Sequence, residues 1–145
     1  MTAMLAFTTA IVVLVTATLS GIFGMAGGMI LMAYLAAAYS VGAAMMLHGA
    51  TQAVSNGYRA TINRRDIVWH LVATNMAGAA AALALFMLVS FVPDKATIFL
   101  VLGAIPFVAF SIPARWGLDI TKPFVAPVCG FVVTALTLTA GVAGP

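Results

Sequence analysis

The stretch that decides the fold is MLAFTTAIVVLVTATLSGIFGMAGGMILMAYLAAAY, residues 4–39, which carries no charged side chain. About 20 apolar residues are enough for a helix to cross the hydrocarbon core of a bilayer, and a straight helix over this whole stretch would extend roughly 54 Å. Because glycine destabilises a helix and lets the backbone turn, we expect a break within Gly24–Gly28. The sequence therefore predicts a discontinuous helix or a re-entrant hairpin over residues 4–39, and the hairpin is favoured.

The composition of the whole chain is that of an integral membrane protein. Of its 145 residues, 64% are hydrophobic and 6% are charged, and the mean hydropathy is +1.18. A soluble domain carries about 25% charged residues, because its surface must be solvated. The six Lys and Arg residues are spread over short loops and form no continuous basic stripe, which argues against a nucleic-acid partner.

Further apolar segments follow the first one, and we expect them at residues 41–62, 67–92, 96–112 and from 123 onward. They predict an all-α membrane protein, a polytopic helix bundle with about four to five hydrophobic segments. Gly78 and Ala82 are small residues four positions apart, a spacing that lets two helix backbones approach closely.

The basic residues indicate the orientation in the membrane. Two loops, Arg59–Asp66 and Arg115–Lys122, hold five of the six Lys and Arg residues, and the connection between them holds only Lys95. The positive-inside rule places both basic loops in the cytoplasm of a multi-pass protein. A hairpin over residues 4–39 would put the N-terminus outside the cell, whereas a single crossing would put it inside.

Cysteine labelling tests this orientation. With Cys129 replaced, single cysteines at Asn63, Thr97 and Thr121 are treated in turn with a membrane-impermeant reagent added from outside. We expect labelling at position 97 alone, because only that position lies in the connection that is poor in basic residues. Ready labelling at position 63 or 121 would contradict the predicted orientation.

A short motif recurs at the end of the sequence. GMAGG at residues 24–28 returns as GVAGP at residues 141–145, each time after an apolar stretch. We therefore expect residues 1–122 to form a first transmembrane repeat and residues 123–145 to be the first helix of a second, incomplete one. The chain would then be one half, plus a helix, of a longer protein. A hairpin in the first segment would make the repeats inverted, an arrangement in which transporters commonly place a binding site.

The segment at residues 41–62 has an unusually polar face. Four polar side chains recur there at helical spacing and share one side of a helix. They are His48, Gln52, Ser55 and Arg59, flanked by Thr51 and Asn56. Polar side chains at membrane depth are costly and tend to face a bundle interior or a watery path. We favour a substrate path, and hydrogen bonding between packed helices is the alternative.

Individual residues of this face have two interpretations each. Arg59 is either a snorkelling anchor or a forked hydrogen-bond donor to an oxyanion. His48 either relays protons or has a structural role, and Asn75 of the next segment either meets the polar face or bonds to another helix. Free N–H groups at the glycine break would suit an anion. The expected substrate-binding residues are therefore Gly24, Gly27, Gly28, His48, Thr51, Gln52, Ser55, Arg59 and Asn75.

Catalytic, metal and cofactor sites are not expected. The chain has one cysteine, Cys129, and its three acidic residues all fall in loops, so neither a Cys-based metal cluster nor an intramembrane acid pair can form. The nine methionines are best explained by apolar packing. We therefore expect no enzyme activity, no metal and no cofactor.

Three stretches of the chain resemble the TauE/SafE family of membrane permeases. They are SGIFGMAGGMILM at residues 20–32, LHGATQAVSNGYRATINRR at residues 47–65, and the acid and tryptophan of Asp66–Trp69. Met29 stands where members often have a third consecutive glycine, and the proline that follows in members is missing near Ala33. The resemblance implies a protein of two similar halves that moves sulfite or organosulfonates across the bacterial inner membrane.

Together with the polar face, this resemblance predicts a permease that moves a small anion by alternating access. Its expected partners are the anionic substrate, the lipid bilayer, and either a second copy of the chain or a complementary second half. The alternative is a non-transporting membrane scaffold or regulatory subunit, or a truncated half-transporter.

Overall fold

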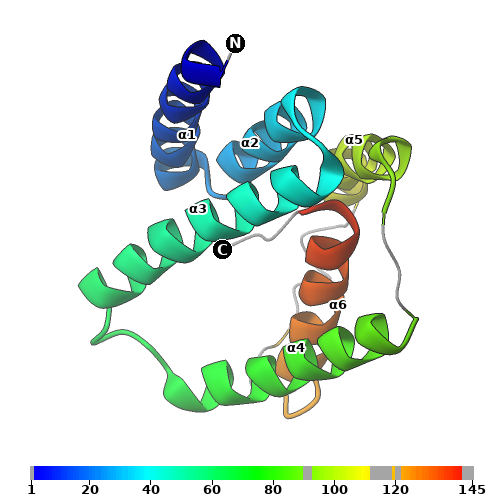
Figure 1. Cartoon of the computed structure of the whole chain (residues 1–145). Coiled ribbons are helices and arrows are strands. Elements are labelled where there is room, and N and C mark those ends of the chain that lie inside the picture. The colour runs from blue at the N-terminus through cyan, green and yellow to red at the C-terminus, as the bar shows by residue number, and fades with distance from the viewer. Residues whose placement is uncertain (1, 90–92, 112–118, 120–121, 142–145) are drawn as a thin grey trace.

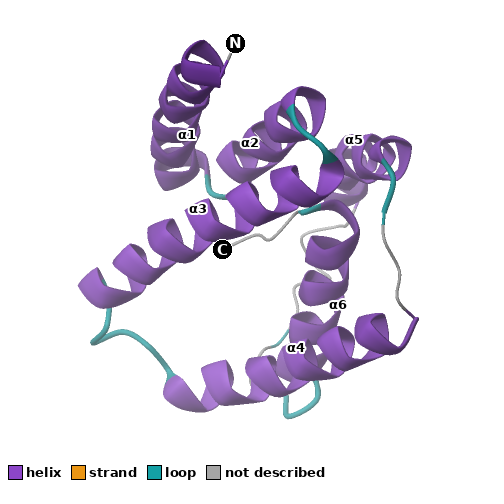
Figure 2. Ribbon diagram, in the orientation of Figure 1, coloured by secondary structure: helices purple, strands orange, loops and turns teal. Residues whose placement is uncertain are grey.

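The computed structural model describes residues 2–89, 93–111, 119 and 122–141, and within these ranges it contains six α-helices and no strand. The helices are α1 (Thr2–Phe23), α2 (Met25–Ala38), α3 (Val41–Ile62), α4 (Trp69–Val89), α5 (Lys95–Ser111) and α6 (Val125–Ala140). α1, α2 and α3 form one group, α4 and α6 form a second, and α5 lies beside α2 (Figures 1 and 2). The predicted all-α fold class is confirmed.

The predicted break occurs at Gly24, the first residue of the expected window. Gly24 has φ 67° and ψ −117°, a conformation that residues with a Cβ rarely adopt. Its amide donates to the carbonyl oxygen of Ser20 at 3.0 Å and closes the last turn of α1. Gly27 and Gly28 remain inside α2. One glycine therefore turns the chain, and the other two have a different role.

The chain reverses at Gly24, so that α1 and α2 form an antiparallel hairpin (Figure 1). Near the break, Gly27 lies against the backbone of Thr16. At the far end, the hydroxyl of Thr9 lies 3.2 Å from that of Tyr34 and 2.6 Å from that of Tyr39. The structure thus confirms a hairpin of two helices in this segment. That the hairpin enters and leaves a membrane on the same side stays a prediction.

α2 is the central element of the molecule, because the apolar core is built around it. α3 turns back along α2 after the Tyr39–Ser40 connection, α5 packs against α2, and Ala140 of α6 joins the same apolar cluster. The buried core residues come from α2, α3, α5 and α6: Leu31, Met32, Leu35, Ala36, Ala44, Ile98, Leu102 and Ala140. Burial of this cluster fixes α2 and α3 side by side.

α4 and α6 are packed backbone against backbone. A Cβ added at Gly78 would overlap the carbonyl oxygen of Pro127, and one added at Gly130 would overlap that of Asn75. The Asn75 amide group also donates to the carbonyl oxygen of Ala126 at 3.2 Å. These contacts join residues 75–78 of α4 to residues 126–131 of α6, where the two helices cross (Figure 1). The prediction that small residues in this segment allow close helix approach is confirmed at Gly78.

Nothing in the fold tests the side of the membrane on which the two basic loops lie, and that orientation stays a prediction. Most of the Arg115–Lys122 loop lies outside the described residues. α5 begins after Asp94, whose carboxylate accepts the Thr97 amide at 2.8 Å and caps the helix. The side chain and the backbone amide of Thr97 hold the pKa of Asp94 below its usual value.

The recurring motif begins at two glycines that share a positive φ but differ in ψ, which is −117° at Gly24 and 15° at Gly141. Gly24 has φ 67° and follows α1, and Gly141 has φ 68° and follows α6. They are the two glycines with positive φ among the described residues. Residues 142–145 of the second motif lie outside the described residues, and the division into repeats stays a prediction.

Two of the described helices are long and apolar enough to cross a bilayer: Ala3–Ile22 within α1, and α4. The core helix of a soluble protein can have the same length and composition, but it is mostly buried, whereas only 11% of each of these segments is buried. α2, α5 and α6 are shorter apolar helices. Insertion of two helices fits these exposed apolar surfaces.

Candidate functional site

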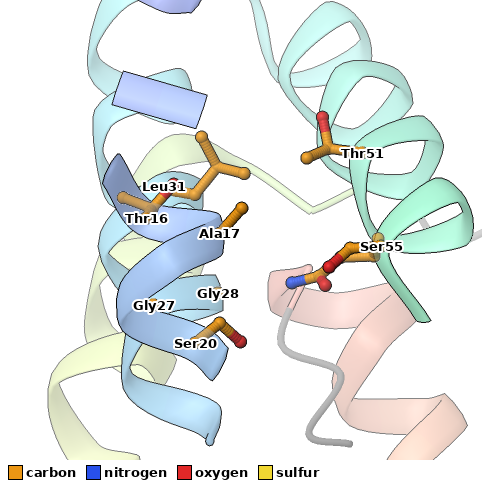
Figure 3. Close-up of a pocket in the computed structure, with 9 residues that line it drawn as sticks. Thr16, Ala17, Ser20, Gly27, Gly28, Leu31, Thr51 and Ser55 are labelled. Atoms are coloured by element: carbon orange, nitrogen blue, oxygen red, sulfur yellow. The ribbon is translucent and has the colours of Figure 1, made fainter. Parts of the chain in front are cut away.

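A small cavity lies between α1, α2 and α3 (Figure 3). Its lining comes from three helices: Thr16, Ala17 and Ser20 of α1, Gly27, Gly28 and Leu31 of α2, and Thr51, Gln52 and Ser55 of α3. In the close-up, Thr51 and Ser55 lie across the cavity from Leu31, Ala17 and Ser20. The α3 polar face and the glycine-rich start of α2 are therefore brought together.

Gly27 allows α1 and α2 to approach closely enough to form one wall of this cavity. A Cβ at this position would overlap the Thr16 carbonyl oxygen and crowd Ser20. Any side chain here would therefore push the two helices apart. Gly28 is buried beside it and lines the cavity. Gly27 thus allows the helix contact, and both glycines leave backbone at the cavity wall.

The hydroxyl groups of the α1 wall are already engaged. Thr16 donates to the Val12 carbonyl at 2.7 Å, and Ser20 donates to the Gly24 carbonyl at 2.8 Å. The Ser20 bond joins the last turn of α1 to the residue that turns the chain, so it helps to fix the break. The amide of Gly24 donates to Ser20 and is therefore not available to a ligand in this conformation.

The free hydrogen-bonding groups of the cavity come from α3. Thr51 donates to the Leu47 carbonyl of its own helix at 2.8 Å. The side chains of Gln52 and Ser55 are half-buried and form no hydrogen bond with another described residue. An amide and a hydroxyl in a partly enclosed cavity can donate to a ligand oxygen. Gln52 and Ser55 are therefore the two predicted site residues best placed to bind one.

The cavity is small. Its volume is about 10 Å³, which is the space of a single water molecule. A sulfite or sulfonate group contains four or more heavy atoms and does not fit unless α3 and the α1–α2 hairpin move apart.

Arg59 lies one turn of α3 beyond Ser55, beside the end of α1. A Cβ added to Gly21 would be 3.9 Å from Nη2 of Arg59, so the guanidinium lies against the last turn of α1. The C-terminal end of a helix carries partial negative charge, which favours a cation by about 0.3–1 kcal/mol. Arg59 is half-buried and makes no ion pair or side-chain hydrogen bond with another described residue. Its five donors therefore remain available near the glycine break.

His48 is placed differently from the rest of the polar face. It is 2% exposed, and neither Nδ1 nor Nε2 has a hydrogen-bond partner among the described residues. An unsatisfied buried polar group costs about 1–3 kcal/mol. His48 does not line the cavity, but it stands one helical turn before Gln52, which does.

Asn75 is not brought to this site. It belongs to the α4–α6 contact, where its side chain bonds to the backbone of α6. Of the two interpretations given for Asn75, the structure therefore supports the hydrogen bond to a neighbouring helix. Conversely, Thr16 and Ser20 line the cavity although they were not among the expected residues. Their signal in the sequence is two hydroxyl residues four positions apart on one side of the first helix, the second of them four residues before Gly24.

No group of three or more His, Cys, Asp or Glu side chains gathers in the part of the chain that the structure describes. The site is thus a cavity of neutral donors with one nearby cation. No family model, curated protein or solved structure matches the chain. The resemblance to the TauE/SafE family accordingly rests on the residues quoted for it.

Proposed function

We propose that this chain is a polytopic permease of the bacterial inner membrane, of TauE/SafE type, which moves a small sulfur-containing anion by alternating access. The observation that carries the proposal is the meeting of the α3 polar face with the glycine break, where Gln52 and Ser55 share a cavity with the glycines of α2. Broken helices at substrate sites are a recurring feature of transporters.

The charges around the cavity favour an anion. α1, α2 and α3 contain no Asp or Glu, and their one Lys or Arg residue is Arg59. Arg59 lies beside Gly21 at the end of α1, and a guanidinium binds oxyanions through two parallel hydrogen bonds. Gln52 and Ser55 add neutral donors. The preference for sulfite or an organosulfonate within the anions comes from the family resemblance.

The small volume of the cavity and the position of Gly24 are consistent with a site that changes shape. A volume of about 10 Å³ excludes a sulfonate in this conformation, and alternating access requires a state in which the site is closed. A hinge absorbs the backbone change between states at a few residues. Gly24, with φ 67° and no Cβ, links α1 to α2 at the edge of the cavity and is the proposed hinge.

A binding screen with the purified full chain in detergent tests the anion specificity. Calorimetric titrations with sulfite, methanesulfonate and acetate are compared, with choline as a cation of similar size. We expect both sulfur anions to bind more tightly than acetate, and choline not to bind, because the charge near the cavity is positive. Equal affinity for acetate and the sulfur anions would contradict the proposed preference for sulfur-containing substrates. Absence of any anion binding would overturn the proposal.

Uptake into proteoliposomes separates a permease from a non-transporting subunit. A permease carries labelled methanesulfonate across the bilayer, and excess unlabelled sulfite competes with it. Binding in detergent without any uptake would instead favour the scaffold or half-transporter alternative.

A further inference from the structure

His48 is the one ionisable side chain of α3 that is buried. It is 2% exposed, and both ring nitrogens lack a hydrogen-bond partner among the described residues. A buried histidine with a structural role normally donates one ring N–H to a carbonyl or carboxylate. His48 therefore lacks the hydrogen bond that a purely structural role would lead one to expect.

His48 lies next to the cavity along α3. Ala44 and His48 are the described buried residues of α3, and the same face continues into Gln52 and Ser55, which line the cavity. Four residues of an α-helix correspond to about 6 Å along its axis. A positive charge on the imidazole would therefore attract an anion in the cavity.

No acidic group is available to neutralise a charge on His48 from the helices packed around it. α1, α2 and α6 contain no Asp, Glu, Lys, Arg or His, and α5 has only Lys95, at its exposed first residue. On α2 and at its end, the ionisable groups are Tyr34 and Tyr39, whose hydroxyls lie within hydrogen-bond distance of Thr9. On α3 itself the other charged group is Arg59, eleven residues further along.

We propose that His48 takes up a proton when an anion occupies the neighbouring cavity, so that anion binding and proton binding are coupled. With the cavity empty, a buried imidazolium without a counter-ion is strongly disfavoured, and the ring is neutral. An anion one helical turn away supplies the missing counter-charge. The coupling is reciprocal, so a proton on His48 tightens the anion to the same extent. This inference rests on the proposed anion site and adds a proton as the coupling ion.

Proton uptake on anion binding is measured on the unmodified full chain in detergent. Methanesulfonate is the probe, because a sulfonate stays ionised over the whole pH range used, whereas sulfite itself titrates. In a weakly buffered solution near neutral pH, we expect up to one proton to be taken up per anion bound. Anion affinity should then rise by up to about tenfold for each unit by which the pH falls through the range where His48 titrates.

Two single substitutions identify the group that takes up the proton. His48→Gln should abolish proton uptake and flatten the pH profile of methanesulfonate affinity, and His70→Gln, which removes the exposed histidine of α4, should leave both unchanged. If methanesulfonate binds with the same affinity across the range and without proton uptake by the unmodified chain, the coupling is disproved while the anion site stands. Proton uptake that persists in a folded His48→Gln variant would likewise exclude His48. If methanesulfonate does not bind at any pH, the anion site and the coupling fail together.

Discussion

Arg59→Lys is expected to weaken methanesulfonate binding about tenfold. Lysine keeps the positive charge, which is all that an anchor at the membrane surface needs, but it loses the planar fork that donates two parallel bonds to an oxyanion. Losing one charge-assisted hydrogen bond costs about 1.5–3 kcal/mol, and the lower end of that range corresponds to the tenfold change. The measurement is a calorimetric titration of the purified variant, with its level in the membrane compared to that of the unmodified chain.

Gln52→Leu and Arg64→Lys complete this experiment. Gln52→Leu replaces a donor of the cavity wall by an apolar group of similar length, and we expect a severalfold to tenfold loss, since a neutral hydrogen bond contributes about 0.5–1.5 kcal/mol. Arg64→Lys makes the same exchange as Arg59→Lys on an exposed loop residue and should be nearly silent. Unchanged binding by both Arg59→Lys and Gln52→Leu would mean that the polar face of α3 serves helix packing and does not bind the anion.

Gly78→Leu is expected to separate α4 from α6. Even a methyl group at Gly78 would overlap the backbone of Pro127, and a backbone cannot move aside as a flexible side chain can. Overpacking of this kind typically costs about 1–3 kcal/mol, and the cost should be at the upper end here because the whole contact must open. Thermal unfolding of the purified chain in detergent, followed by circular dichroism, should show a clearly lower midpoint.

Gly103→Leu is the matched control for this prediction. Gly103 also lies inside a helix, α5, but a Cβ there would meet nothing within 4 Å. Exchanging this glycine should leave the midpoint unchanged or raise it slightly, since leucine is the better helix former. Gly130→Leu, on the other side of the α4–α6 contact, should behave like Gly78→Leu. Equal midpoints for the Gly78 and Gly103 variants would mean that the α4–α6 contact does not stabilise the fold.

The helices themselves follow from local sequence. The expected segments at residues 41–62 and 96–112 correspond to α3 (Val41–Ile62) and α5 (Lys95–Ser111). Apolar runs that end at polar or proline-containing turns determine such boundaries, because they depend on neighbours within a few positions. The first segment contained enough information to predict a break but not to choose among its glycines. That choice fell on Gly24 because Gly27 must stay helical to lie against Thr16.

The sequence by itself determined the composition class, the break near Gly24 and the polar face of α3, since each depends on residue type and on spacing along one helix. Only the tertiary structure decided which helices meet that face. It brought Thr16 and Ser20 of α1 to Gln52 and Ser55, and it placed Asn75 against α6 through the contacts at Gly78 and Gly130. The physical reason is that helical spacing shows which side of a helix is polar, whereas the partner of that side depends on where two distant backbones can approach. Such an approach depends on small residues whose partners lie far away in the chain, as at Gly78 with Pro127 and at Gly130 with Asn75.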